Sequence, residues 1–216
     1  MHSLQELLVI ECFAWPLIAM DKYHLHWFTD EIHIHTSSAL ASYMHMLHVV
    51  EKAETRQLRQ VWFALLSFLT HAAMVSKLFD PIRRDNAKEQ RNEALREHLQ
   101  VEKGAAFLPR EARDNLEHID ERIDRWVRSG NNKVIQMVFE DRQGFEYLVE
   151  RGAAVRRVLI LSEMVFISED RNGNRIETAL TPIFESLQTL HARCELKLHT
   201  ESPYNYLLAR ALEERQ

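Results

Sequence analysis

Residues 39–79 read ALASYMHMLHVVEKAETRQLRQVWFALLSFLTHAAMVSKLF, and this stretch contains neither Gly nor Pro. Its apolar residues recur three and four positions apart, which is the spacing of one face of an α-helix. The charged stretch 51–60 predicts either a break or an exposed middle, and Asp80-Pro81 ends the run. The apolar positions that carry the pattern are Leu40, Tyr43, Met44, Leu47, Leu58, Val61, Trp62, Leu65, Leu66, Leu69 and Ala73.

The composition of the whole chain agrees with long helices. Of the 216 residues only 5 are Gly and 5 are Pro, whereas all-β folds use both residues in turns. Apolar residues make up 46% and charged residues 27%, which is ordinary for a soluble globular protein and excludes disorder over most of the chain. The net charge of −5 means that the protein as a whole is not an obvious binder of polyanions.

The two cysteines, Cys12 and Cys194, are too few for a disulfide framework or a Cys-rich zinc site. A reduced, cytoplasmic protein is the simplest interpretation. Residues 7–20 (LLVIECFAWPLIAM) resemble a signal peptide only in being apolar. No basic residues precede them, and they are too short to cross a bilayer, so we expect a buried first helix over 4–20 that Pro16 kinks or ends.

Three further segments have helical or ambiguous patterns. Residues 21–36 are ambiguous between a loop and a helix, with Ser37 and Ser38 as candidate caps for a helix that begins after them. A helix is expected over 86–101, and residues 104–109 form a linker. Residues 111–128 give the clearest amphipathic helix, which the sequence Ser-Gly-Asn-Asn at 129–132 ends.

The C-terminal part of the chain changes character. Residues 155–167 are rich in β-branched residues, and Asn172-Gly173 predicts a hairpin turn with a return strand over 175–180. Thr181 is a candidate cap of a last helix, with Pro182 at its first position. We therefore predict a mainly α fold, a helical bundle with a short C-terminal β-hairpin. Residues 1–150 would form the bundle, and residues 151–216 would pack on it as part of one domain.

Motifs of several enzyme classes are absent from the sequence, namely the phosphate-binding loop, the dinucleotide fingerprint, the nucleophile elbow, HExxH and the EF-hand loop. Histidines are concentrated near the N-terminus, and two of them, His45 and His48, are nearly one helical turn apart. Such pairs can share a metal ion, but polar side chains on a partly exposed helix explain them as well. The histidines of this cluster are His24, His26, His33, His35, His45 and His48.

An Arg separated from a later His by four to six residues occurs at Arg91/His98, Arg113/His118 and Arg193/His199. Chance alone gives about three such pairs in a chain of this composition, so helix geometry must separate them. On a helix over 111–128, His118 points away from the apolar stripe, and Asp114 lies one turn before it, where a carboxylate can orient an imidazole. The predicted stripe consists of Leu116, Ile119, Ile123 and Trp126.

The stretch Arg113–Trp126, RDNLEHIDERIDRW, resembles the signature helix of the HEPN superfamily, in which an Arg, a polar residue and a His share one helix. Residues 66–77 (LSFLTHAAMVSK) are similar to the long helix that precedes this signature in a bacterial subgroup. The resemblance covers about residues 60–130. It implies an all-helical bundle that dimerises and brings two copies of the motif into one cleft.

The resemblance also implies a metal-independent endoribonuclease of a bacterial toxin–antitoxin or antiphage defence system, without cofactor. His118 would move the proton, Arg113 would hold the charge that develops on phosphorus, and Asp114 would orient His118. The expected substrate-binding residues are Asn115, Arg122 and Arg125. The expected partners are RNA, a second copy of the chain and an antitoxin or defence-system protein, and no membrane is expected.

Two alternatives stay open. The first is a non-catalytic HEPN-like module that binds or assembles a partner, for which Arg113 and His118 would be dispensable. The second is a helical protein that binds metal through its N-terminal histidines, which would carry stoichiometric metal after purification.

Overall fold

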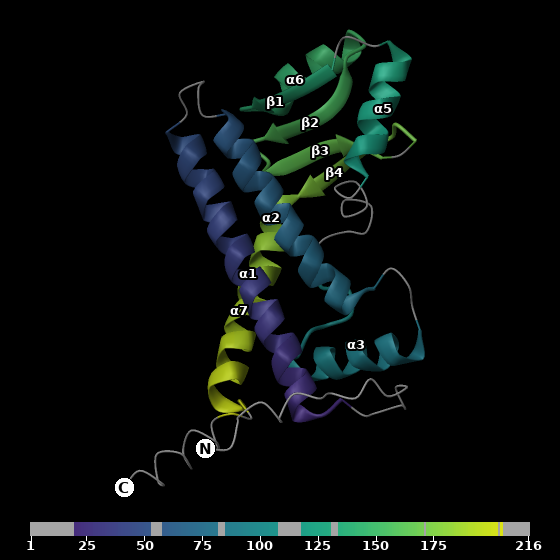
Figure 1. Ribbon diagram of the computed structural model, residues 1–216. Helices are drawn as coiled ribbons and strands as arrows, with labels where there is room; N and C mark the ends of the chain where they lie inside the picture. Colours follow the sequence, from purple (N-terminus) through teal and green to yellow (C-terminus); the bar gives the residue numbers. More distant parts are fainter. Residues whose placement is uncertain are drawn as a thin grey trace, which may run out of the picture.

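The computed structural model describes residues 20–52, 58–81, 85–107, 118–130, 134–170, 172–202 and 204. These residues form a mainly α fold with a small four-stranded sheet at one end (Figure 1). The helix expected over 4–20 lies outside the described residues. The helices are α1 (Lys22–Glu51), α2 (Leu58–Phe79), α3 (Asn86–His98), α5 (Ile119–Ser129), α6 (Arg142–Glu150) and α7 (Leu180–Thr200), and the strands are β1 (Val134–Phe139), β2 (Ala154–Ile160), β3 (Val165–Glu169) and β4 (Arg175–Ala179).

The first long helix begins at Lys22, within the segment whose sequence pattern is ambiguous between a loop and a helix. The Asp21 carboxylate accepts hydrogen bonds from the backbone N–H groups of Tyr23 and His24, both at 2.9 Å, and so caps α1. Ser37 and Ser38 lie in the middle of this helix, so the prediction that they cap it is wrong. The Ser37 hydroxyl instead donates to the His33 carbonyl at 2.7 Å. The charged stretch 51–60 marks the end of α1 and the beginning of α2.

The main core lies where α1, α2 and α7 pack together. Phe68 of α2 is fully buried, and its ring lies 5.1 Å from that of Tyr43 of α1, which stacks at 4.4 Å on Phe184 of α7. Among the described helices, α2 is long and apolar enough to cross a membrane, but 56% of its most apolar window is buried in this core. A mostly buried helix of this kind is typical of the core of a soluble protein.

The sheet is larger than the predicted hairpin. Its strand order is β1-β2-β3-β4, with β1 and β2 parallel and the other neighbours antiparallel. The apolar segment expected over 155–167 forms two strands, β2 and β3, separated by the turn 161–164. The strand β1 and the helix α6 were not predicted, because a short apolar run such as VIQMVF does not distinguish strand from buried helix.

The sheet is packed on both faces. Phe145 of α6 is fully buried against one face, among Val158, Ile160 and Ile167. Leu159 and Phe166 point to the other face and join the core of the helical bundle. The sequence predicts a division of the chain after residue 150. Strand β1 lies before this position and β2 after it, so the sheet includes residues on both sides of the predicted division.

The prediction that His118 lies within a helix over 111–128 is wrong, because α5 begins at Ile119 and His118 precedes its first helical position. The end of α5 and the beginning of α7 lie close to the predicted positions. Helix α5 ends at Ser129, followed by Gly130 with φ of 64°, a left-handed conformation that glycine adopts without strain. Helix α7 begins at Leu180 with Ala179 as its cap, so Thr181 and Pro182 lie within the first turn rather than at the predicted cap. Cys194 of α7 is buried, and burial raises the pKa of its thiol to about 12.

Candidate functional site

The predicted catalytic histidine stands at the beginning of α5. His118 is the residue before the first helical position, with φ of −111° and ψ of 37°, and its side chain is 53% exposed. Its Nδ1 atom lies 3.2 Å from Oε1 of Glu121 in the first turn of the helix. A carboxylate at this distance can hold the ring in one orientation and favour the tautomer that carries its proton on Nδ1.

Three of the predicted site residues, Arg113, Asp114 and Asn115, lie outside the described residues. The pairing of Arg113 with His118, and the orienting role of Asp114, therefore stay predictions. Glu121 was not predicted to contact His118, although its position three residues further along the helix places it on a neighbouring part of the surface.

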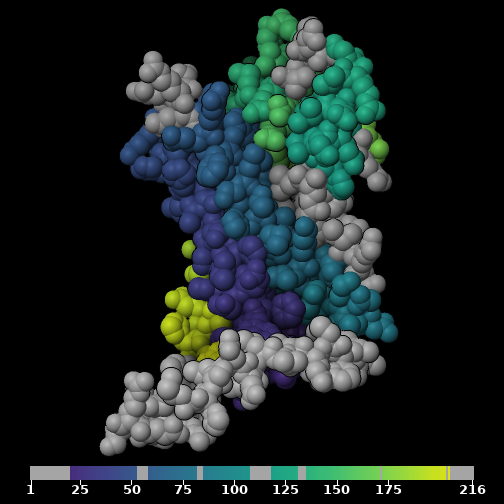
Figure 2. Space-filling view, in the orientation of Figure 1, coloured from purple at the N-terminus to yellow at the C-terminus, as the bar shows by residue number. Residues whose placement is uncertain are grey.

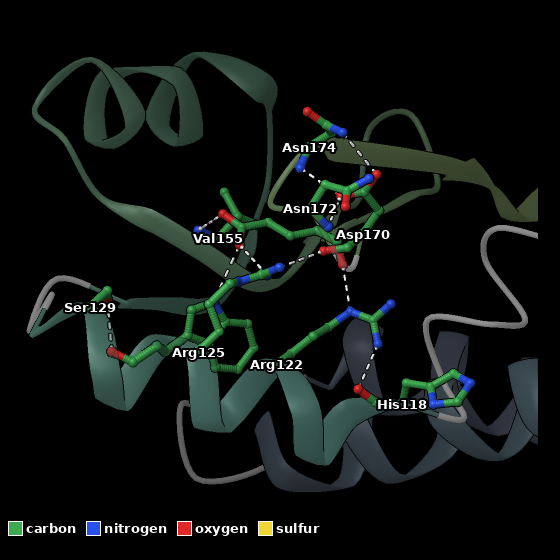
Figure 3. Close-up of polar contacts among 10 residues, drawn as sticks. His118, Arg122, Arg125, Ser129, Val155, Asp170, Asn172 and Asn174 are labelled. Atoms are coloured by element: carbon green, nitrogen blue, oxygen red, sulfur yellow. Dashed lines mark hydrogen bonds and ion pairs between the residues drawn. The ribbon is translucent and has the colours of Figure 1, made fainter.

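The two predicted substrate-binding arginines of α5 are bound to other parts of the protein (Figure 3). Arg122 is only 4% exposed, and its guanidinium donates to the carbonyl groups of Glu169 and His118, each at 2.8 Å. Arg125 donates to the Asp170 carbonyl at 3.0 Å and to the Glu169 carboxylate at 3.2 Å. Both side chains thus attach α5 to the turn that joins β3 and β4.

The buried face of α5 differs from the predicted stripe. Trp126 is buried as predicted, but Arg122, one turn earlier, is the other buried residue of the helix, and Ile123 is 38% exposed. The helix contacts a turn rich in backbone carbonyl groups, and these acceptors favour a long guanidinium side chain over an aliphatic one. Leu116, a further member of the predicted stripe, lies outside the described residues.

Glu169 at the end of β3 connects α5 with the sheet. Its Oε2 atom accepts from Arg125 and from the indole N–H of Trp126, the latter at 3.3 Å, while Oε1 accepts from the backbone N–H of Val155 in β2 at 3.3 Å. Asp170 follows and closes the turn by accepting the backbone N–H groups of Asn172 and Asn174 at 2.7 and 2.8 Å. The start of α5, with His118, is therefore held in place by a dense set of polar contacts.

The arginines of the other two Arg/His pairs contact other parts of the protein. Arg91 stacks on Phe28, with 5.3 Å between its guanidinium carbon and the ring centre, and donates to the Leu78 carbonyl. Arg193 donates to the carbonyl groups of Leu99 and Gln100. The arginine of each of these two pairs thus joins two elements of the bundle, whereas Arg113 lies outside the described residues.

Two of the N-terminal histidines, His33 and His35, each contact a histidine of another helix. The Nδ1 atoms of His35 in α1 and His71 in α2 lie 2.9 Å apart, so one ring donates and the other accepts. The ring of His33 stacks on that of His191 in α7 at 4.6 Å. No group of three or more His, Cys, Asp or Glu side chains within the described ranges could hold a metal ion. The sequence identified the histidines but could not show that they meet across helix interfaces.

These pairs predict that acid destabilises the bundle. Burial, and then the neighbouring His35, lower the pKa of His71, and burial, and then His33, lower that of His191. The unfolded chain, with histidine pKa values of about 6.5, binds more protons than the folded chain below that pH. The contribution of these histidines to the free energy of unfolding should therefore be constant above about pH 6.5 and should decrease as the pH falls below that value.

Urea denaturation at a series of pH values measures this dependence. A His71→Gln variant should show a weaker loss of stability in acid than the wild type, because one titrating group is gone. The exposed His45 provides the control, and His45→Gln should keep the wild-type slope. Equal slopes for all three proteins would contradict a role of the His35–His71 pair.

Comparison of this chain with protein-family models, with curated proteins and with solved structures found no match. The case for any function therefore rests on the residues and the geometry described above.

Proposed function

We propose that this protein is a metal-independent endoribonuclease of the HEPN type, with His118 as the residue that moves the proton. The observation that supports this most directly is the environment of His118. Its imidazole is 53% exposed and lies against the Glu121 carboxylate. The residue directly precedes α5, a helix that buried polar contacts hold in place. A general base needs accessibility, a defined orientation and a rigid support.

The proposed reaction needs only side chains. The unprotonated nitrogen of His118 takes the proton from a ribose 2′-hydroxyl, and the 2′-oxygen attacks the adjacent phosphorus. The 5′-oxygen of the next nucleotide leaves and takes up a proton, which produces a 2′,3′-cyclic phosphate and a 5′-hydroxyl end. Arg113 is the proposed group that stabilises the negative charge on the phosphoryl oxygens in the transition state.

The proposed functional unit is a homodimer, since each chain carries one Arg113/His118 pair. The composition of α1 and α2, whose surfaces lie beside each other in Figure 2, supports this. Helix α1 has no Asp, Glu, Lys or Arg between Ile32 and Val50, and α2 has none from Gln60 to Ser76. The exposed side of the two helices instead carries apolar side chains, among them Ile34, Met74 and Phe63, the last 74% exposed.

The size of this surface fits a second copy of the chain. A helix of 22 residues is about 33 Å long, and two packed helices present a width of about 20 Å. The resulting area of about 650 Å² for each copy is close to the roughly 800 Å² that each partner buries in a standard interface. Uncharged faces avoid like-charge repulsion when the same surface meets itself about a two-fold axis.

The experiment that tests the function is RNA cleavage by the purified protein in excess EDTA, with light scattering to measure the molecular mass. We expect cleavage, products with 2′,3′-cyclic phosphate ends, and a mass of twice the 25.5 kDa of one chain. Cleavage that EDTA abolishes would contradict the metal-independent reaction. A monomer that is fully active would contradict the composite site.

A non-catalytic module that binds or assembles a partner is the second candidate. It is favoured by the positions of Arg122 and Arg125, which donate to protein acceptors and so contribute to the fold rather than to a substrate site. This candidate predicts no cleavage over a range of RNA sequences. The proposed role in a toxin–antitoxin or antiphage system, with a partner protein, rests on the resemblance of residues 113–126.

A further inference from the structure

An irregularity in the pairing of β1 with β2 occurs at two arginines that follow each other in the sequence, Arg156 and Arg157. Ile135 of β1 pairs with Val155 of β2, but the next residue, Gln136, pairs with Arg157, so that Arg156 is one extra residue in β2. Such a β-bulge interrupts the regular alternation of side chains and changes the direction in which they point. Bulges are frequent beside binding sites for this reason.

The two arginines lie next to different parts of the fold. The guanidinium carbon of Arg156 lies 5.7 Å from the ring centre of Trp126 in α5. Arg157 shares a strand face with Leu159, two residues further on, and Leu159 packs in the main core. The bulge therefore breaks the alternation of side chains at two consecutive positive residues.

Neither of the two guanidinium groups forms an ion pair with the residues that the structure describes. In this part of the chain, neither group takes part in a hydrogen bond or an ion pair, and the Nε atom of Arg156 is buried without an acceptor. Burial, and then the positive charge of Arg156, lower the pKa of Arg157. The adjacent carboxylate of Glu169 already accepts from Arg125, Trp126 and Val155.

Two neighbouring cations that are partly removed from water and form no ion pair destabilise a protein. An anion that contacts both would remove this penalty, and guanidinium groups bind phosphate oxygens through paired N–H donors. We propose that Arg156 and Arg157 form a binding site for the backbone phosphates of single-stranded RNA. This inference rests on the proposed function, because it takes RNA as the ligand that the protein meets.

The position of the pair relative to His118 favours a polymer. Arg156 lies next to Trp126, which is eight residues after His118, a rise of about 12 Å along α5. A strand whose phosphate is bound by the arginines can therefore reach His118 with a neighbouring phosphodiester. A mononucleotide bound at the arginines would not span this distance.

The test measures binding separately from cleavage. Binding of a labelled 2′-O-methyl RNA, which cannot form the cyclic phosphate, is followed by fluorescence anisotropy at several salt concentrations. We expect Arg156→Gln/Arg157→Gln to weaken binding at least tenfold and to make the dependence of log affinity on log salt shallower by about 0.7–1.4, since each phosphate contact contributes about 0.7. The matched control is Arg151→Gln, which removes the same type of charge from the exposed end of α6.

The stability of the double variant distinguishes a binding role from a structural one. Because the described residues provide no acceptors for these groups, the midpoint of urea denaturation should be unchanged or higher in the double variant. A lower midpoint together with unchanged RNA affinity would show that the arginines serve folding. RNA affinity equal to that of the wild type would by itself overturn the proposal.

Two further outcomes separate this inference from the proposed ribonuclease. Binding that depends on Arg156 and Arg157 without any cleavage would support the site and contradict the nuclease. Cleavage of RNA together with unchanged RNA binding in the double variant would support the nuclease and contradict the arginine site. Titration with AMP tests a mononucleotide as the source of the phosphate, and AMP binding that depends on the two arginines, with no effect on RNA, would overturn the assignment to RNA.

Discussion

Replacement of His118 by alanine is expected to lower the rate of RNA cleavage by about 10²–10⁴-fold, the range over which a positioned acid–base group accelerates a reaction. The side chain is the imidazole that the proposed mechanism requires, and at 53% exposure it supports little of the fold. The rate should be measured in a single turnover in EDTA, so that neither product release nor a metal ion contributes. The free energy of unfolding should stay within about 0.5 kcal/mol of the wild type.

The chain offers a matched control in its third Arg/His pair. His199 is exposed in the last turn of α7, and Arg193 of the same pair is bound to the carbonyl groups of Leu99 and Gln100. His199→Ala removes the same type of side chain and should leave the cleavage rate unchanged. A His118→Ala protein that cleaves at the wild-type rate, or an equal loss in both variants, would contradict the assignment of the proton transfer to His118.

Replacement of Arg122 by methionine is expected to lower the free energy of unfolding by about 2–4 kcal/mol. Methionine keeps the length and apolar stem of the side chain but removes every N–H donor. The carbonyl groups of Glu169 and His118 then lose donors at 2.8 Å, and hydrogen bonds from charged donors are worth about 1.5–3 kcal/mol each. The attachment of α5 to the sheet should weaken, so the cleavage rate should decrease together with stability.

Urea denaturation of Arg122→Met beside Arg128→Met tests this prediction. Arg128 lies on the same helix, but its side chain is 80% exposed and pairs only with the exposed Asp124 in the described contacts. Its replacement should change stability by less than about 1 kcal/mol, as for most surface ion pairs. Similar losses in the two variants would show that burial of Arg122 contributes little.

Much of the helical framework is predictable from the sequence, because it depends on local patterns. The apolar spacing within 39–79, the break at the charged stretch 51–60 and the Gly130 terminator are all properties of a few neighbouring residues. The strand β1 is different, because it is stabilised by parallel pairing with a segment about twenty residues away. A single short run of apolar residues contains no information on such a partner.

The candidate site shows the same division. The motif identifies His118 from residue type and spacing, but its contact with Glu121 and the anchoring of α5 by Arg122 depend on the position of the β3–β4 turn. A helical projection assigns arginine to the solvent side because the residue is charged. In the folded protein the backbone carbonyl groups of the turn offset the loss of hydration, and Arg122 is buried while Ile123 is exposed.

The sequence by itself determines that this is a mainly α protein and where several of its helices begin and end, since these features follow from local periodicity and capping. It also identifies the candidate site residues, namely histidines and arginines. Only the tertiary structure decides which of them meet. The His35–His71 contact joins two helices, and the bulge at Arg156 exists only because β1 pairs with β2. Packing between distant segments creates such neighbours, and the free energy of that packing depends on the whole fold rather than on any local pattern.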